Sequence, residues 1–492
     1  MKVLLEKSFA LIKKFWPIVV TFIFICIYMQ SFDSMIDISG DAASIWQTIK
    51  SYFTGEMVPS YVLYKGFASV YPYNWLYELS NVVGVDEFYF IKLFHAIIFT
   101  YVATIGIPNI IKQITKKETK PYRIMLLSII LFWFWEPSYA LSQLMIDLPS
   151  LGYYILLVNS VLKIAEGKKN IFSYIFSGLL AGLCLCLSGQ YSIAVLLLIV
   201  FLLIKSFNKN ILKNFKQSAK VFMLLSIFFV CLGSVKYTNF IFEKNVTNVL
   251  RENGASIPTG EEWLQRGYFR LMDTYRIATG TELKDNRGYA IEKDFFDPEG
   301  KGFNERHTLI ENGGVSITTK QYLYLVSKYP ADFAMKYVNR IFVALSPDGG
   351  LFKFYPLFVA YSLFFITWII LIKNVKNMKQ FFSPNILIVL SFIMAIAALL
   401  VLQVEMRTVM QIQGLIYGFA ILSDDFWNAI KKIGQSIKQL FVEKSLTILH
   451  DVKIPYVFLI YILFMFFCFT HMGTLYEANG INSNTILINF GL

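Results

Sequence analysis

The sequence has few of the residues that build metal centres and disulfide frameworks. Its 492 residues include only five cysteines and four histidines. The histidines are scattered and show no spacing typical of zinc ligands. All five cysteines fall within apolar stretches, so the polar segments are not built on disulfides. We therefore expect no metal centre and no certain cofactor, while a divalent cation stays an open alternative.

Charged residues are also scarce. Only 16% of the residues are charged, whereas 56% are hydrophobic and 17% are aromatic, and the mean hydropathy is +0.54. A soluble chain of this length would carry more charge. The sequence contains no glycine-rich phosphate loop and no Ser-His-Asp spacing. This argues against an enzyme that uses soluble nucleotides on the inner side of a membrane.

Long apolar stretches are what the sequence has in abundance. Most are about 17–25 residues long, the length at which an α-helix crosses a bilayer. We predict an all-α integral membrane protein with about eleven transmembrane helices. The predicted spans are 14–31, 88–107, 123–141, 149–164, 171–187, 190–205, 220–240, 353–372, 384–403, 409–423 and 454–471.

The basic residues predict how the chain is threaded through the membrane. Lysine and arginine gather in 112–123, 205–220 and 431–453, which all lie on the inner side if the N-terminus is cytoplasmic. The formal net charge of +12 then reflects topology and attraction to anionic lipid heads, not nucleic-acid binding. We expect a multi-pass plasma-membrane protein that keeps its first span, because that span lacks a small-residue cleavage site.

The predicted spans divide the chain into three parts. The N-terminal transmembrane module, 1–241, contains a first outer loop at 32–87. A large, mainly helical outer loop or cap follows at 242–350. The C-terminal transmembrane module, 351–492, includes an inner amphipathic helix at 424–453.

The first outer loop combines an apolar stripe with a run of aromatic residues. The stripe repeats at helical spacing and predicts a helix that lies in the plane of the membrane interface. The aromatic run is typical of a belt at headgroup level, or of a platform for a sugar or lipid headgroup. Tyr64, Tyr71 and Trp75 are the candidates for contact with a sugar or an acceptor. The stripe comprises Ala42, Ile45, Trp46, Ile49 and Phe53.

Polar residues gather at the predicted outer face. Asp37, Asp41 and Asp147 are candidate catalytic groups, because a carboxylate can take a proton from a hydroxyl. Lysine and arginine side chains hold phosphate oxygens. Lys92 and His95 lie one helical turn apart in the second span, where hydrogen bonding within the bundle is the structural alternative. The candidate phosphate ligands are Lys65, Arg407, Lys92 and His95, and Glu405 is a candidate for acceptor binding.

The order of these residues resembles the GT-C superfamily of polyprenyl-phosphate-sugar-dependent glycosyltransferases. In that family an aspartate follows the first span and begins an interfacial helix, which Asp41 matches best, with Asp37 as the second choice. Asp147-Leu148-Pro149 is similar to the family's aspartate and proline at the start of the fourth span. Tyr64-Lys65-Gly66 is similar to a loop that contacts the lipid phosphate, although the family's neighbouring prolines are missing. Glu405-Met406-Arg407 resembles a late outer Glu-x-Arg pattern.

This resemblance implies an inverting glycosyltransferase. It would move a monosaccharide from a polyprenyl-phosphate donor, of the undecaprenyl type, to a cell-envelope glycan or glycolipid on the outer membrane face. Asp41 would be the base, Lys65 and Arg407 would hold the leaving phosphate, and Asp147 would orient the acceptor or assist a cation.

Each of these residues also has a structural alternative. An aspartate at a helix start often serves as an N-cap, which applies to Asp41 and Asp147. Lys65 suits a side chain that snorkels to the membrane surface. Glu405 and Arg407 suit a mutual ion pair that closes a turn.

Two other functions remain open on the sequence. A lipid-linked oligosaccharide flippase or other transporter would show internal repeats and charges deep in the bundle, and the sequence shows neither. A membrane polysaccharide polymerase shares the large outer loop, but would be expected to place arginines at the centre of its chemistry.

Overall fold

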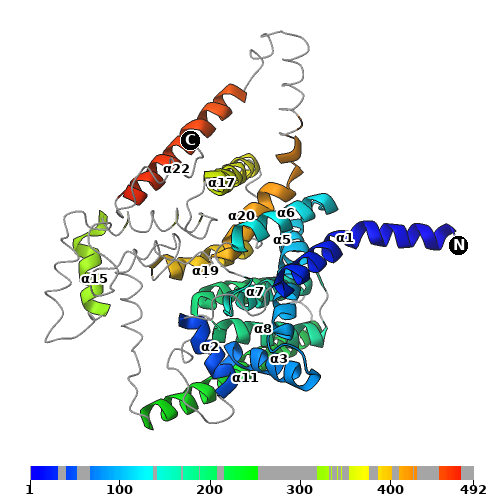
Figure 1. The fold of residues 1–492 in the computed structure, drawn as a ribbon, viewed down its shortest axis with the longest axis vertical. Coiled ribbons are helices and arrows are strands. Elements are labelled where there is room, and N and C mark those ends of the chain that lie inside the picture. Colours follow the sequence, from blue (N-terminus) through cyan, green and yellow to red (C-terminus); the bar gives the residue numbers. More distant parts are fainter. Residues whose placement is uncertain are drawn as a thin grey trace. The chain divides into compact units, whose positions relative to one another are not determined.

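The described part of the protein is helical. The computed structural model describes residues 2–31, 40–51, 67–136, 141–167, 170–187, 189–207, 215–252, 319–331, 354–375, 386–401, 409–424 and 454–477, with a few short pieces besides. Within these ranges every regular element is a helix (Figure 1). The structure therefore confirms an all-α protein for this part of the chain.

Four of the described helices are long and apolar enough to cross a membrane. They are Tyr89–Thr115, Asp147–Ala165, Lys216–Asn245 and Tyr355–Ile372. Shorter apolar helices lie at Phe15–Gln30, Pro121–Trp135, Ile171–Leu187, Ser192–Ser206, Ile386–Ala397, Met410–Leu422 and Phe458–His471. The chain is a multi-pass membrane protein by these criteria, while the count of eleven spans stays a prediction.

The chain forms two compact units. The first comprises Met1–Pro258, Met378–Ala398 and Met410–Ile412, and the second comprises the remaining residues. In the first unit the helices are α1 (Lys2–Gln30), α2 (Gly40–Ser51), η3 (Phe67–Ser69), α3 (Tyr71–Val83), α4 (Tyr89–Tyr101), η4 (Val102–Gly106), α5 (Ile107–Thr115), α6 (Pro121–Trp135), α7 (Asp147–Ala165), α8 (Ile171–Leu187), η6 (Gly189–Tyr191), α9 (Ser192–Ser206) and α11 (Phe215–Glu252).

Helix α7 lies in the core of the first unit. Buried residues make up 78% of its apolar span, against 28% for the span in α11. The α7 side chain of Tyr154 stacks on Tyr191 with ring centroids 4.9 Å apart. Its hydroxyl is 2.8 Å from Ser391, in the part of α19 (Ile386–Val401) that belongs to this unit. Helix α11 instead leaves much of its apolar surface for lipid.

Helices α4, η4 and α5 form one long rod with a wider turn in its middle. The wider turn is the π-helical segment η4. Such segments leave local carbonyl groups without their usual helical partners. The α7 side chain of Asn159 donates to the Gly106 carbonyl at 3.1 Å and to the Ile155 carbonyl at 2.9 Å. This buried amide therefore satisfies backbone oxygens at a depth where water is absent.

Two glycines let α8 and α11 approach closely. A β-carbon added at Gly182 would lie 2.6 Å from the Val235 β-carbon, and one added at Gly178 would collide with the Phe228 carbonyl oxygen. The four-residue spacing puts both glycines on one face of α8, the arrangement that permits close backbone contact between membrane helices.

Replacing these glycines by alanine is expected to destabilise the protein. Overpacking a close contact costs about 1–3 kcal/mol, and neither the Phe228 carbonyl oxygen nor the Val235 β-carbon can rotate away from the added methyl group. Thermal unfolding of the purified protein in detergent measures the loss. Gly233→Ala is the matched control, since a β-carbon there meets nothing within 4 Å. Equal melting temperatures in all three variants would contradict the close contact.

The second unit contains α15 (Thr319–Lys328), α17 (Phe354–Val375), most of α20 (Met410–Leu422) and α22 (Ile454–Glu477). Helices α17 and α22 pack through aromatic rings, as between Phe365 and Phe464, whose centroids are 5.3 Å apart. The hydroxyls of Ser362 and Tyr461 are 2.8 Å apart. Most of the predicted inner amphipathic helix and residues 253–318 of the predicted cap lie outside the described residues.

The apolar stripe of α2 is covered by protein. Ala42, Ile45, Trp46 and Ile49 are buried, while the position of this helix in the plane of the membrane interface stays a prediction. The Trp46 ring lies 4.5 Å from that of Phe88. Helical periodicity identifies a face that must be covered, but it does not say whether lipid or protein covers it.

Candidate functional site

The structure describes about half of the predicted site. Asp41 is the second residue of α2, which places it in the first turn of that helix. Lys92, His95, Asp147, Tyr71 and Trp75 are described in full. The other predicted residues, Asp37, Tyr64, Lys65, Glu405 and Arg407, lie outside the described residues.

A buried glutamate holds the segment that leads into α7. Glu136 follows α6 directly and is 8% exposed. One carboxylate oxygen accepts hydrogen bonds from the Tyr28 and Ser142 hydroxyls, both at 2.6 Å. The other oxygen accepts the Leu141 backbone N–H at 3.2 Å. These bonds tie the end of α1 and the segment 141–146 to the end of α6.

Burial sets the protonation of this glutamate. It raises the pKa of the Glu136 carboxyl above its ordinary value, and the hydrogen bonds from Ser142, Tyr28 and Leu141 only partly offset the effect. The sequence interpretation did not select this residue. The available signal was a glutamate placed just after an apolar run and just before Pro137.

Glu136→Gln is expected to change how stability depends on pH. Because the pKa of Glu136 is raised in the folded state, the folded protein binds more protons than the unfolded chain between the two pKa values. Stability therefore falls as the pH rises through that interval. Glutamine does not titrate, so the variant should lose this part of the slope as the pH rises above about 4, the ordinary value for a glutamate.

Thermal unfolding in detergent over that pH range measures the slope. Glu87→Gln, at an exposed position in the turn before α4, is the matched control and should keep the wild-type slope. An unchanged slope in Glu136→Gln would show that burial does not favour the protonated carboxyl.

His95 forms the second buried tie to the same segment. Its Nδ1 is 2.6 Å from the Leu141 carbonyl oxygen, and its Nε2 is 2.7 Å from the Tyr73 hydroxyl. A carbonyl only accepts hydrogen bonds, so Nδ1 carries the proton and the neutral ring accepts at Nε2. The Tyr73 hydroxyl is also 2.8 Å from the Met145 carbonyl, and its one proton is shared between the two acceptors.

This geometry favours the structural alternative for His95. The residue is fully buried, and both of its ring nitrogens are engaged by protein. As placed here it offers neither nitrogen to a phosphate. Its effect is to hold the segment 141–145 against α3 and α4.

Asp147 lies where this segment enters α7. The N-cap position is Ile146, so Asp147 is the first residue inside the helix, where a negative charge is favourable. Its Oδ2 atom is buried. Burial raises the pKa of Tyr73, with further contributions from Tyr153 and Asp147. The Asp147 carboxylate also adds to the raised pKa of Tyr191, which is mainly due to burial. The carboxylate therefore lies within electrostatic reach of two buried phenols.

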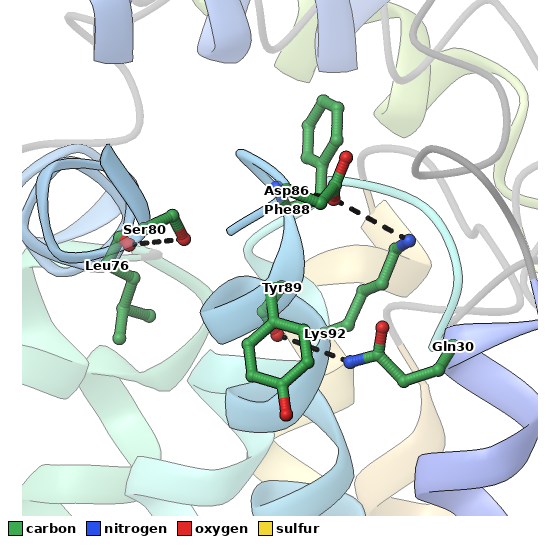
Figure 2. Close-up of polar contacts among 7 residues, drawn as sticks. All are labelled: Gln30, Leu76, Ser80, Asp86, Phe88, Tyr89 and Lys92. Carbon is green, nitrogen blue, oxygen red and sulfur yellow. Dashed lines mark hydrogen bonds and ion pairs between the residues drawn. The ribbon is translucent and has the colours of Figure 1, made fainter. Parts of the chain in front are cut away.

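Lys92 is a buried cation in the first turn of α4. It is 2% exposed, and its Nζ is 3.9 Å from Asp86 Oδ1 (Figure 2). The same aspartate oxygen accepts the Phe88 backbone N–H at 2.9 Å. Gln30, at the end of α1, donates to the Tyr89 carbonyl at 3.5 Å. The ion pair is long and Asp86 is partly exposed, so it contributes about 0–1 kcal/mol to stability. Phosphate binding by Lys92 stays a prediction.

The two described aromatic candidates differ in their surroundings. Tyr71 is partly buried, with its ring 6.4 Å from that of Phe242 on α11. Trp75 is 70% exposed. Both lie on α3 on either side of Tyr73 in the sequence, but Tyr73 points into the buried network. Sugar or acceptor contact by Tyr71 and Trp75 stays a prediction.

Comparison with known proteins assigns no family to the chain. No protein-family model, curated protein or solved structure matches it. Within the described ranges, no group of three histidine, cysteine, aspartate or glutamate side chains could hold a metal ion.

The candidate site is the set of Glu136, His95, Tyr73 and Asp147. Segment 141–146 joins these residues at one end of the apolar helices.

Proposed function

We propose that this protein is an inverting membrane glycosyltransferase of the GT-C type. It moves a monosaccharide from a polyprenyl-phosphate donor to an envelope glycan or glycolipid. The observation that carries the proposal is Asp147, an aspartate at the first position of a membrane helix. Its segment is tied down by Glu136 and His95. A carboxylate held in place at the end of apolar helices suits a reaction between a lipid-borne donor and a polar acceptor.

The proposed reaction is a single displacement. Asp41 takes the proton of an acceptor hydroxyl, and the acceptor oxygen attacks the anomeric carbon of the donor. The bond from that carbon to the phosphate oxygen breaks, and the phosphate leaves with the electron pair. Lys65 and Arg407 hold the leaving phosphate, Arg407 by a two-pronged contact, and Lys92 adds positive charge at the same helix end.

The remaining residues position the reactants in this proposal. Asp147 orients the acceptor, and the pair of Tyr73 and His95 keeps the Asp147 segment in place. Tyr71 and Glu405 contact the acceptor or the sugar. The site faces the outside of the plasma membrane, and the N-terminus is cytoplasmic.

Transfer of labelled sugar tests the proposal. Purified protein in lipid nanodiscs is given undecaprenyl-phosphate monosaccharides labelled in the sugar, together with an envelope glycan fraction. We expect label to move to the glycan fraction while free undecaprenyl phosphate is released in equal amount. A panel of donors that all stay intact, with protein that is folded by thermal unfolding, would overturn the proposal.

A lipid-linked oligosaccharide transporter is the second candidate. The π-helical segment η4, with its buried partner Asn159, widens one turn of a membrane helix, and such segments are frequent at functional sites. A transporter would move a labelled lipid-linked oligosaccharide across vesicles without cleaving it. The same nanodisc assay, followed by an assay of lipid movement in vesicles, separates the two functions.

A further inference from the structure

Helix α3 has three distinct sides. The buried side consists of Tyr73, Asn74 and Ser80, which face the protein. A polar exposed side carries Glu78 and Asn81. The third side is exposed and apolar, and we call it the α3 stripe. It comprises Trp75, Leu79, Val82 and Val83, which are 70%, 43%, 82% and 55% exposed.

The exposed apolar residues of α3 are neighbours on the helix surface. At about 100° per residue, Trp75, Leu79 and Val82 lie within one sector of about 60°, and Val83 borders it on one flank. Glu78 borders it on the other flank, about 40° from Val82, and Asn81 lies about 60° further around the helix. An apolar sector with polar residues to one side is the pattern of a helix that lies at a lipid surface.

The α3 stripe continues toward a membrane helix. A short turn, 84–88, joins α3 to α4, and Gly84 takes the left-handed conformation (φ 74°) that ends α3. Figure 2 shows this turn beside the start of α4. Val85 in the turn and Tyr89 at the start of α4 are 38% and 40% exposed. Ile97, further along α4, is 50% exposed on a helix long enough to cross the bilayer.

This continuity identifies the lipid bilayer as what covers the α3 stripe. The exposed apolar surface of a membrane helix is covered by acyl chains, and only the five residues 84–88 lie between α3 and that helix. Trp75 near the start of the stripe suits the boundary between headgroups and acyl chains. The exposed charged neighbours of the stripe, Glu78 and Asp86, are acidic, so attraction to anionic lipid does not explain the arrangement.

We propose that α3 lies in the membrane interface with the α3 stripe inserted among lipid acyl chains. Its polar side then faces water, and its buried side holds the site. Tyr73 on that buried side contacts His95 and the Met145 carbonyl, so α3 fixes the Asp147 segment at the level of the lipid surface. This inference does not depend on which reaction occurs, because it concerns where α3 lies, but it assigns Trp75 to lipid in place of the predicted sugar or acceptor contact.

Spin labels along α3 test the inference. The parent chain carries Cys26→Ala and Cys231→Ala, since these two cysteines are partly exposed and the other three are buried. Single cysteines then replace Trp75, Leu79 or Val82 on the stripe. The labelled protein is studied in phosphatidylcholine vesicles, with oxygen as the probe that concentrates in lipid and a water-soluble nickel chelate as the probe that does not.

A cysteine at Asn81, about 100° from Val82 and about 120° from Trp75 around the same helix, is the matched control. For labels on the stripe, the ratio of oxygen to nickel collision rates should exceed that of the control by at least about threefold. The ratio should stay the same when phosphatidylglycerol replaces part of the phosphatidylcholine, because insertion is apolar. Size-exclusion profiles and melting temperatures of the labelled proteins check that each variant is folded.

Three outcomes would overturn the inference. Equal ratios at stripe and control positions would place the stripe in water. Labels on the stripe that are immobile and reached by neither probe would show that protein covers it, either another segment of this chain, a second copy or a partner. Insertion that occurs only in the presence of phosphatidylglycerol would show that charge attraction, and not apolar contact, holds α3 at the membrane.

Discussion

Asparagine at position 41 is expected to reduce sugar transfer by about 10²–10⁴-fold, the usual cost of losing a positioned general base. Asp41→Asn is nearly isosteric, so it removes the base without removing bulk. Donor binding and expression should change little. The measurement is the initial rate of label transfer from the polyprenyl-phosphate donor, together with donor affinity in nanodiscs.

Asp37→Asn is the matched control for Asp41→Asn. Asp37 precedes α2, whereas Asp41 lies in its first turn, so Asp37→Asn should have the smaller effect. If Asp41 only supports the start of the helix, Asp41→Asn would lower the melting temperature and leave turnover close to normal. That result would sink the catalytic assignment.

Asp147→Asn should give the second large effect. Losing a hydrogen bond to a charged group costs about 1.5–3 kcal/mol, or about tenfold to more than a hundredfold in rate. Because Asp147 is proposed to orient the acceptor, most of the loss should appear as a raised KM for the acceptor, with donor affinity unchanged. Steady-state kinetics with the acceptor varied at saturating donor measures this division.

Two further variants make the Asp147 result specific. Glu87→Gln removes a negative charge at an exposed position in the turn before α4 and should keep normal kinetics. Tyr73→Phe removes the hydroxyl that contacts His95 and the Met145 carbonyl, so it should reproduce part of the Asp147→Asn defect by loosening the segment. Normal acceptor kinetics in Asp147→Asn would contradict the orienting role.

Part of the candidate site could be predicted from sequence. An aspartate and a proline at the start of an apolar run identified Asp147, and the structure places it at the first position of α7. Glu136 was missed because its importance comes from Tyr28, 108 positions earlier in the chain, and from Ser142. A pattern in one stretch of sequence does not report such a contact. His95 was selected, but the engagement of both its nitrogens is visible only in three dimensions.

The helices themselves follow from the sequence. In a bilayer every backbone N–H and C=O must be bonded within the chain, so a long apolar run has essentially one local solution, the α-helix. The break near position 188 was also readable, and the structure has two separate helices there, α8 and α9.

What covers each helix was decided only by tertiary structure. Both α2 and α3 carry an apolar face, and the sequence predicted α2 as a helix in the plane of the membrane interface. The structure buries the α2 face against Phe88 and Tyr77 and leaves the α3 stripe exposed. Periodicity determines which side chains share a face, but the partner of that face depends on packing between segments far apart in the chain.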